Sequence, residues 1–324
     1  MSDIQYKLVK DLFSIPAGEM KVPVFGQCSD ESRAFVPTQH ADYVFRKENV
    51  RDVLAFLLRP HGDALWLTGP TGSGKTSLIC ETAARLNWPV CQVTCHGSME
   101  FSELRGQFVV TSRHEGEQPS MQYRYGALSQ AMKYGYILLI NEIDLMDPAE
   151  LAGLNDVLEG RPLVISENGN EVIEPHANFR LIATANSNGA GDGTGLYQGI
   201  QTQNIAAMDR YRVLNIDYPE QNVEISILEN VAPALGKQVH KLMVKLANSI
   251  RTAFQGSSGM PGTISVTMST RTLVRWALLS QDFFGASNAL KYALDQALLN
   301  RCNAVEREAI TDLCKVCFGD MWTK

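Results

Sequence analysis

The stretch Gly69-Pro70-Thr71-Gly72-Ser73-Gly74-Lys75-Thr76 decides the fold of this chain, because it matches the phosphate-binding pattern G-x-x-x-x-G-K-[ST] at every required position. An apolar run at 64–67 precedes it, and apolar residues at helical spacing follow it in 77–86. A phosphate-binding loop needs this context, with a buried strand before it and a helix after it. The stretch therefore predicts a nucleoside triphosphate site.

Each part of the loop has an expected task. Gly72 and Gly74 let the backbone curl so that successive N–H groups and the helix N-terminus point at a phosphate. Lys75 is expected to reach the β- and γ-phosphates, and the hydroxyl of Thr76 to ligate Mg²⁺. The other loop residues expected to line the nucleotide are Gly69, Pro70, Thr71 and Ser73.

Length and composition describe an ordinary globular chain. Its 324 residues are 45% apolar, which suits two domains better than one. The formal charge is −6 and there is no long block of like charges, so the sequence gives no sign of a basic surface for duplex nucleic acid. Nucleic acid is therefore not expected as a partner. Residues 1–7 lack a signal pattern and apolar runs are short, so we expect a cytoplasmic protein that needs no membrane.

The cysteines raise the question of a metal site. There are seven, an odd number that suits a reducing compartment better than a disulfide framework. Cys91 with Cys95, and Cys314 with Cys317, could each hold zinc, but neither pair has a second ligand pair at zinc-like spacing nearby. The period-two alternation in 90–95 favours thiols on the covered face of a strand, and the second pair lies in an apolar helical pattern.

The remaining patterns describe the α/β part in chain order. Residues 1–42 carry scattered Pro and Gly and are expected to form an extended arm that wraps the core or a neighbour. Further expected elements are a helix at 50–58, a strand at 90–93, a helix capped near Ser98 or Ser102, and a hairpin at 108–125 that interrupts it. Then come a strand at 137–142, a helix from Pro148, a hairpin at 163–173, a strand at 179–184, a Gly-rich mobile loop at 187–199 and a last strand at 213–216.

From about residue 220 onward the patterns are helical. Strands that alternate with helices predict an α/β fold with a doubly wound parallel sheet, which binds ligands at the carboxyl ends of its strands. We therefore expect three parts: an N-terminal arm at 1–42, a nucleotide-binding domain at 43–218 and a small helical lid domain at 219–324.

Polar residues follow the predicted strands. Glu142 ends a strand that we expect to lie beside the phosphate loop, where it can act on a water near the γ-phosphate. Asn186 ends another strand and can hold that water or sense the γ-phosphate; the alternative is a loop residue that bonds its own backbone. Asn141 stands where an aspartate that holds Mg²⁺ is expected, so negative charge is missing there, and Asp144 or a substrate phosphate is a candidate to supply it.

Taken together, these residues resemble the AAA+ ATPases. The matching segments are 69–76 as Walker A, 137–142 as Walker B, 184–186 as sensor 1, Met208-Asp209-Arg210-Tyr211 as the arginine-finger segment and Ser269-Thr270-Arg271 as sensor 2. The hairpins at about 107–125 and 161–174 resemble the helix-2 insert and the pre-sensor-1 hairpin of the MoxR group. Within that group the CbbQ/NirQ/CobS branch fits best.

Inside the branch, the chain looks most similar to the ATPase subunits of aerobic cobaltochelatase. The segments that carry this similarity are 83–89, 179–186, 191–197, 203–204 and 208–210. The resemblance implies ATP as the nucleotide, a hexameric ring, and a larger CobT-like partner with a von Willebrand factor A (VWA) domain. The departures are Asn141 for the usual aspartate and His96-Gly97-Ser98, which leans toward CbbQ-type proteins.

The same resemblance assigns roles to arginines. Arg210 would stabilise transition-state charge on the nucleotide of the next subunit, with Arg212 as the alternative finger, and Arg271 would couple the lid to the γ-phosphate. Two other functional classes stay open at this point. A P-loop kinase would need a second substrate pocket and no arginine from a neighbour, and a nucleotide-binding scaffold would bind without hydrolysis.

Overall fold

The computed structural model describes residues 4–26, 29–111, 120–191, 198–256 and 262–322. The chain divides into two compact units. An α/β unit holds 1–39, 47–69 and 75–216, and a helical unit holds 217–324 together with the short segments 40–46 and 70–74. The polar tip of the first predicted hairpin and much of the Gly-rich loop, whose mobility we expected, lie outside the described residues.

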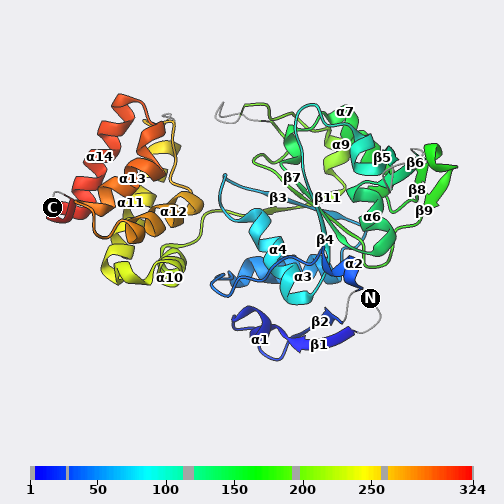
Figure 1. Ribbon diagram of the computed structural model, residues 1–324, viewed down its shortest axis with the longest axis horizontal. Coiled ribbons are helices and arrows are strands. Elements are labelled where there is room, and N and C mark those ends of the chain that lie inside the picture. The colour runs from blue at the N-terminus through cyan, green and yellow to red at the C-terminus, as the bar shows by residue number, and fades with distance from the viewer. Residues whose placement is uncertain (1–3, 27–28, 112–119, 192–197, 257–261, 323–324) are drawn as a thin grey trace. The chain divides into compact units, whose positions relative to one another are not determined.

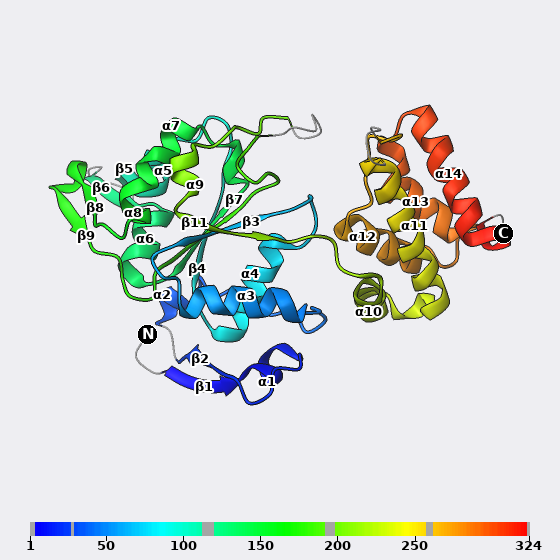
Figure 2. The ribbon, with the colours of Figure 1, turned by 180° about the vertical axis from the view of Figure 1, so that it is seen from behind.

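The α/β unit is built on a five-stranded parallel sheet in the order β11-β3-β10-β7-β4 (Figure 1). Its strands are β3 (Ala64–Thr68), β4 (Val90–Thr94), β7 (Ile137–Asn141), β10 (Arg180–Thr184) and β11 (Tyr211–Asn215). Figures 1 and 2 show α3 (Lys47–Leu58) and α4 (Lys75–Leu86) against one face and α6 (Ala127–Tyr134) against the other. All five residues of β7 are buried, as helices on both faces require.

The strand order places β10 in the middle of the sheet. We expected the strand of Glu142, β7, to lie beside the phosphate loop, and Asn141 at its end accepts a hydrogen bond from Thr76 of that loop. Within the sheet, β10 pairs with both β3 and β7 and lies between them. The order follows from the crossover after β7, which returns the chain so that β10 lies between β3 and β7. The consequence is that Asn186, which follows β10, lies next to the phosphate loop.

The N-terminal segment is a folded hairpin and not an extended arm. β1 (Ile4–Leu8) and β2 (Lys21–Phe25) pair antiparallel, with α1 (Val9–Phe13) between them and α2 (Asp30–Arg33) after them. As expected, the segment packs on the core. The Asn87 amide donates to the carbonyls of Phe25 and Gly26 at 2.9 and 2.7 Å, and the Phe25 ring contacts Trp88 edge-on.

Two hairpins project from the α/β unit, as the patterns indicated. β5 (Gly106–Thr111) pairs with β6 (Ser120–Tyr125), and β8 (Leu163–Ile165) pairs with β9 (Glu171–Ile173) through the turn η3 (Ser166–Asn168). The helix before the first hairpin, α5 (Phe101–Arg105), is capped by Glu100 in a capping box and not by Ser102.

The helix expected from Pro148 is broken into α7 (Pro148–Leu151), η2 (Ala152–Leu154) and α8 (Asn155–Leu158). Two further short elements complete the α/β unit, η1 (Ile143–Leu145) and α9 (Ile205–Met208). η1 follows β7 and therefore lies at the carboxyl edge of the sheet, whereas α9 precedes β11.

The helical unit has its own apolar core around Trp276, which is fully buried. Its elements are α10 (Gln221–Val231), η4 (Pro233–Leu235), α11 (Lys237–Gln255), α12 (Thr270–Asp282), α13 (Ala289–Ala297), η5 (Leu299–Arg301), α14 (Ala304–Phe318) and η6 (Gly319–Trp322). Across the described ranges, none of the helices combines the length and apolarity that a bilayer crossing requires.

The paired cysteines lie in apolar surroundings. Cys91 and Cys95 are buried on the sheet, and Cys314 and Cys317 are buried in the helical core. Burial raises the pKa of the Cys91 thiol to about 12, because the thiolate would lose its hydration. In the described part of the chain, no group of three or more His, Cys, Asp or Glu side chains is arranged to hold a metal ion.

Candidate nucleotide-binding site

The phosphate loop runs from the end of β3 to the start of α4, and two of its glycines are required by the structure. Gly69 has φ 143°, and a Cβ there would lie 2.2 Å from the carbonyl oxygen of Ile216. Gly72 has φ 69°, and a Cβ there would lie 2.7 Å from the side chain of Ser269. Side chains at either position would meet both a steric clash and an unfavourable backbone conformation.

Lys75 begins α4 and is buried despite its charge. Its Nζ donates to the Gly69 carbonyl at 2.6 Å and to Asn186 Oδ1 at 3.0 Å. The contact with Asn186 follows from the pairing of β3 with β10, which places the ends of these strands side by side. The Asn186 side chain therefore bonds the loop lysine, and the alternative of a turn residue that caps its own backbone is not favoured.

Thr76 and Asn141 also lie together. Thr76 Oγ1 donates to Asn141 Oδ1 at 2.6 Å, and Thr184 Oγ1 donates to the same oxygen at 3.2 Å. Hydroxyl and amide oxygens are ligand types that Mg²⁺ accepts, so the donor set fits a magnesium ion delivered with nucleotide phosphates. We call Lys75, Thr76, Asn141 and Asn186 the strand-end cluster.

Glu142 stands directly after β7 with its side chain exposed. Its backbone is left-handed, with φ 54° and ψ 41°, and its N–H donates to Thr184 Oγ1 at 3.3 Å. A non-glycine residue in this region costs about 1 kcal/mol or more, and such strain is concentrated at functional sites. The strain is invisible in sequence, because nothing in the residue type announces the conformation.

Asp144 has a task that the sequence did not reveal. Its carboxylate is fully buried, and Oδ2 accepts the backbone N–H groups of Asn186 and Ser187 at 2.9 and 3.0 Å. Its own carbonyl accepts the N–H of Gln201 at 2.7 Å. Asp144 therefore fixes the turn that carries Asn186. The only signal available in sequence was a carboxylate two residues after Glu142.

The arginines of the finger segment are paired within the α/β unit. Arg210 forms an ion pair with Glu159 and donates to the Ala206 carbonyl at 2.5 Å. The hydrogen bond from Arg210, together with the charge of Arg161, lowers the pKa of Glu159. Arg212 donates to Asp63 at 3.2 Å. The structure does not bring Arg210 or Arg212 into the hydrogen bonds of the strand-end cluster.

Arg271 lies in the first turn of α12, in the helical unit, and is exposed. Within the described ranges, its guanidinium makes no hydrogen bond or ion pair. The Arg271 Cβ lies 3.5 Å from the position that a Cβ on Gly72 would occupy, so this turn packs against the tip of the phosphate loop.

Comparisons with known proteins agree with this geometry. Residues 64–200 match the AAA domain (dynein-related subfamily), and residues 224–317 match the CbbQ/NirQ/NorQ C-terminal family. The aerobic cobaltochelatase subunit CobS of Sinorhizobium sp. is 30% identical over 96% of this chain and 90% of its own length. The chain belongs to the AAA+ ATPases of the MoxR group, in the CbbQ/NirQ/CobS branch.

More distant similarities extend the comparison. Midasin of Dictyostelium discoideum is 28% identical over 78% of this chain, which corresponds to 4% of midasin. Among solved structures, a RuvB mutant of Thermotoga maritima superposes with a TM-score of 0.52 at 15% identity, over 80% of this chain and 73% of RuvB. At that identity the likeness shows the AAA+ fold alone. Family membership makes the chain a nucleotide-dependent enzyme of the ATPase type.

Proposed function

We propose that this MoxR-group member hydrolyses ATP and uses the energy to remodel a protein complex. The observation that carries the proposal is the strand-end cluster, in which Lys75 contacts Asn186 at 3.0 Å and Thr76 contacts Asn141 at 2.6 Å. The groups that we propose bind phosphate, hold a metal and sense the γ-phosphate therefore lie side by side. Such preorganised polar groups are what phosphoryl transfer requires.

In this proposal each residue has one role. Lys75 compensates the charge of the β- and γ-phosphates, and Asn186 orients the attacking water or the γ-phosphate itself. Glu142, held in its strained conformation beside Thr184, accepts a proton from the water. Thr76 and Asn141 would hold Mg²⁺, which supplies positive charge against the phosphates when bound.

A ring supplies what one chain lacks. We propose a homo-oligomeric ring, a hexamer by family resemblance, in which Arg210 of one subunit stabilises charge on the nucleotide of the next. The ion pair with Glu159 would have to open for this, at low cost because the Arg210 side chain is 28% exposed and surface pairs are weak. Arg271 would report the γ-phosphate to the lid.

The proposed substrate follows from the relationship to CobS. Identity of 30% over nearly the whole chain supports a cobaltochelatase-type role, ATP-dependent metal insertion into a corrin ring together with a CobT-like VWA-domain partner in the cytoplasm. A second candidate is a CbbQ-type ATPase that activates another complex, or a weakly hydrolysing scaffold. Asn141 is the observation that favours the scaffold, because an amide at the metal position carries no charge.

Affinity purification from the native cells tests the partner, and reconstitution tests the reaction. With the co-purifying VWA protein, ATP and Co²⁺, we expect cobalt to enter a corrin acceptor, and the Lys75→Ala protein to insert none. A carboxylase or another enzyme in place of a chelatase would favour the CbbQ-type alternative. No phosphate release with any partner, together with ATP-dependent assembly, would favour the scaffold.

A further inference from the structure

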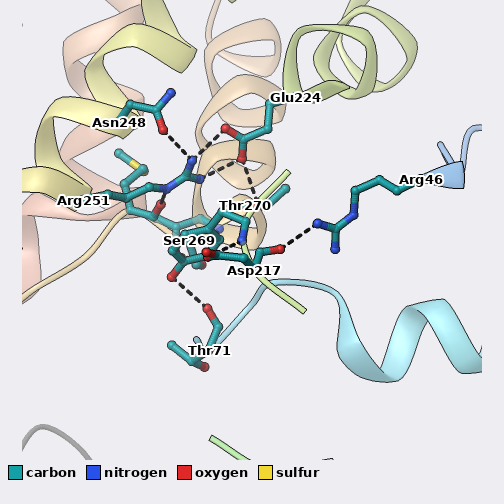
Figure 3. A network of polar contacts seen from close by, with 11 residues as sticks. Arg46, Thr71, Asp217, Glu224, Asn248, Arg251, Ser269 and Thr270 are labelled. Atoms are coloured by element: carbon teal, nitrogen blue, oxygen red, sulfur yellow. Dashed lines mark hydrogen bonds and ion pairs between the residues drawn. The ribbon is translucent and has the colours of Figure 1, made fainter. Parts of the chain in front are cut away.

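A short connector follows the last strand of the sheet and enters the helical unit, and its residue Tyr218 touches the phosphate loop. Tyr218 Oη donates to the backbone carbonyl of Thr71 at 3.1 Å. Just before it, the Asp217 carbonyl accepts from Arg46 Nη1 at 2.8 Å (Figure 3). The connector is therefore held on one side by Arg46 and bonds the loop tip on the other.

The ring of Tyr218 also contacts the helical core. The Arg251 guanidinium lies over it, 4.2 Å from the ring centroid. Arg251 itself is bound to Glu224 through both terminal nitrogens at 2.7 Å, and the two side chains are 6% and 0% exposed. A buried bidentate ion pair of this kind keeps a fixed geometry, because a buried charge that loses a partner strongly destabilises the fold.

The same ion pair fixes the start of α12. Arg251 Nε donates to the Met268 carbonyl at 2.7 Å, and Thr270 Oγ1 donates to Glu224 Oε1 at 2.7 Å. Figure 3 shows Glu224 and Thr270 beside Arg251. The next residue in the chain is Arg271. An unbroken series of contacts therefore runs from the Thr71 carbonyl through Tyr218, Arg251 and Glu224 to the turn that carries Arg271.

We propose that Tyr218 is a positioning residue that transmits the conformation of the phosphate loop to the first turn of α12. When the loop closes on phosphates its tip carbonyls are re-aimed, and the Tyr218 hydroxyl follows the Thr71 carbonyl while its ring stays on Arg251. The Arg251–Glu224 pair passes the shift to 268–270 because it bonds both ends of that segment. The proposal rests on nucleotide binding at the loop, and adds a link that does not pass through the γ-phosphate contact of Arg271.

The hydroxyl of Tyr218 can be removed without disturbing the core. Tyr218→Phe keeps the ring over Arg251 and deletes the bond from its hydroxyl to Thr71. Changes at Arg251 or Glu224 would instead leave a buried charge without its partner. Tyr292→Phe is the matched control, a tyrosine of the same unit whose side chain is half exposed and packs on Phe283. The variants are made in the full chain.

Amide hydrogen exchange with and without ATP measures the link. In the wild type and in Tyr292→Phe we expect ATP to slow exchange both in α4, after the loop, and in 269–274. In Tyr218→Phe we expect α4 to stay protected and the ATP-dependent slowing in 269–274 to fall about three- to tenfold, the range for one neutral hydrogen bond.

Four outcomes would overturn the link. Full protection of 269–274 in Tyr218→Phe, or none in the wild type while α4 is protected, refutes it and leaves the nucleotide site standing. No protection of α4 in the wild type refutes the nucleotide site, and with it the link that depends on that site. Equal losses in Tyr218→Phe and Tyr292→Phe would show a general loosening of the helical unit, which also refutes it.

Discussion

The strand-end cluster and the finger segment differ in how complete they are within one chain. Lys75, Thr76, Asn141 and Asn186 already contact one another in pairs at 2.6 to 3.0 Å. Arg210, by contrast, is engaged with Glu159 and the Ala206 carbonyl. Binding groups are thus assembled in the single chain, while the group expected to complete hydrolysis is held elsewhere. This difference is what an enzyme that binds alone but hydrolyses only in an assembly would need.

Lys75→Ala gives the largest expected effect, because it removes the charge at the centre of the strand-end cluster. We expect ATP affinity to fall on the order of 10²-fold or more, since hydrogen bonds to charged groups are the strong ones. Turnover is lost with it. Equilibrium binding of a fluorescent ATP analogue measures the loss, and Lys237→Ala, in a surface ion pair with Glu229, is the control that should bind normally.

Arg210→Ala tests the finger segment. We expect isolated subunits to bind ATP normally and the assembled protein to lose about 10³-fold or more in hydrolysis, the usual range for an arginine finger. Phosphate release at fixed assembly measures it, with Arg212→Ala beside it. A large loss in Arg212→Ala and little in Arg210→Ala would move the finger to Arg212.

Mixed assemblies decide whether the finger acts between subunits. Subunits with Arg210→Ala keep Glu142, and subunits with Glu142→Gln keep Arg210, so some interfaces of a mixture regain a complete site. Partial recovery of turnover is expected. If mixtures never exceed the separate variants, the arginine acts within its own subunit and the comparison between the two regions fails.

Glu142→Gln should separate binding from hydrolysis inside the α/β unit. The amide keeps the shape of the side chain but cannot accept the proton of the water, so hydrolysis should fall about 10²- to 10⁴-fold while ATP stays bound. Single-turnover assays with labelled ATP measure both quantities. Equal loss of binding in Glu142→Gln and Lys75→Ala would contradict the division of roles.

Much of this site could be predicted from sequence, and the reason is local. The phosphate loop depends on glycines and a lysine at fixed spacing, and the polar ends of β7 and β10 followed buried runs that periodicity identifies. Strand order could not be read the same way, because the pairing of β10 between β3 and β7 depends on contacts far apart in the chain.

Other features were hidden because residue type does not determine them. The left-handed backbone of Glu142 and the two N–H groups bound by Asp144 appear only once η1 and the turn after β10 face each other. The pairing of Arg210 with Glu159 joins residues that are distant in sequence and carry no motif for it. The α5 cap was misassigned because Glu100 caps less commonly than serine does.

Asn141→Asp is the smallest expected effect and examines the one position of the strand-end cluster that departs from the family pattern. The change is nearly isosteric and adds a charge beside Thr76, whose Oγ1 lies 2.6 Å from Asn141 Oδ1. Charge-assisted contacts are roughly twice as strong as neutral ones, so the Mg²⁺ concentration for half-maximal activity should fall roughly a few-fold. A Mg²⁺ titration of phosphate release in both proteins measures the shift.

The same substitution distinguishes a motor from a scaffold, because a motor needs Mg²⁺ bound for hydrolysis and a scaffold needs ATP to stay uncleaved. A slow motor should turn over as fast or faster once the carboxylate binds Mg²⁺ better. A scaffold that must keep ATP intact should assemble with ATP and hydrolyse almost none of it. In that case the Asn141→Asp variant should have a shorter-lived assembled state, which light scattering measures. Identical Mg²⁺ dependence in the two proteins would show that Asn141 bonds Thr76 and Thr184 for structural reasons only, and the metal would then depend on Thr76 and the phosphates.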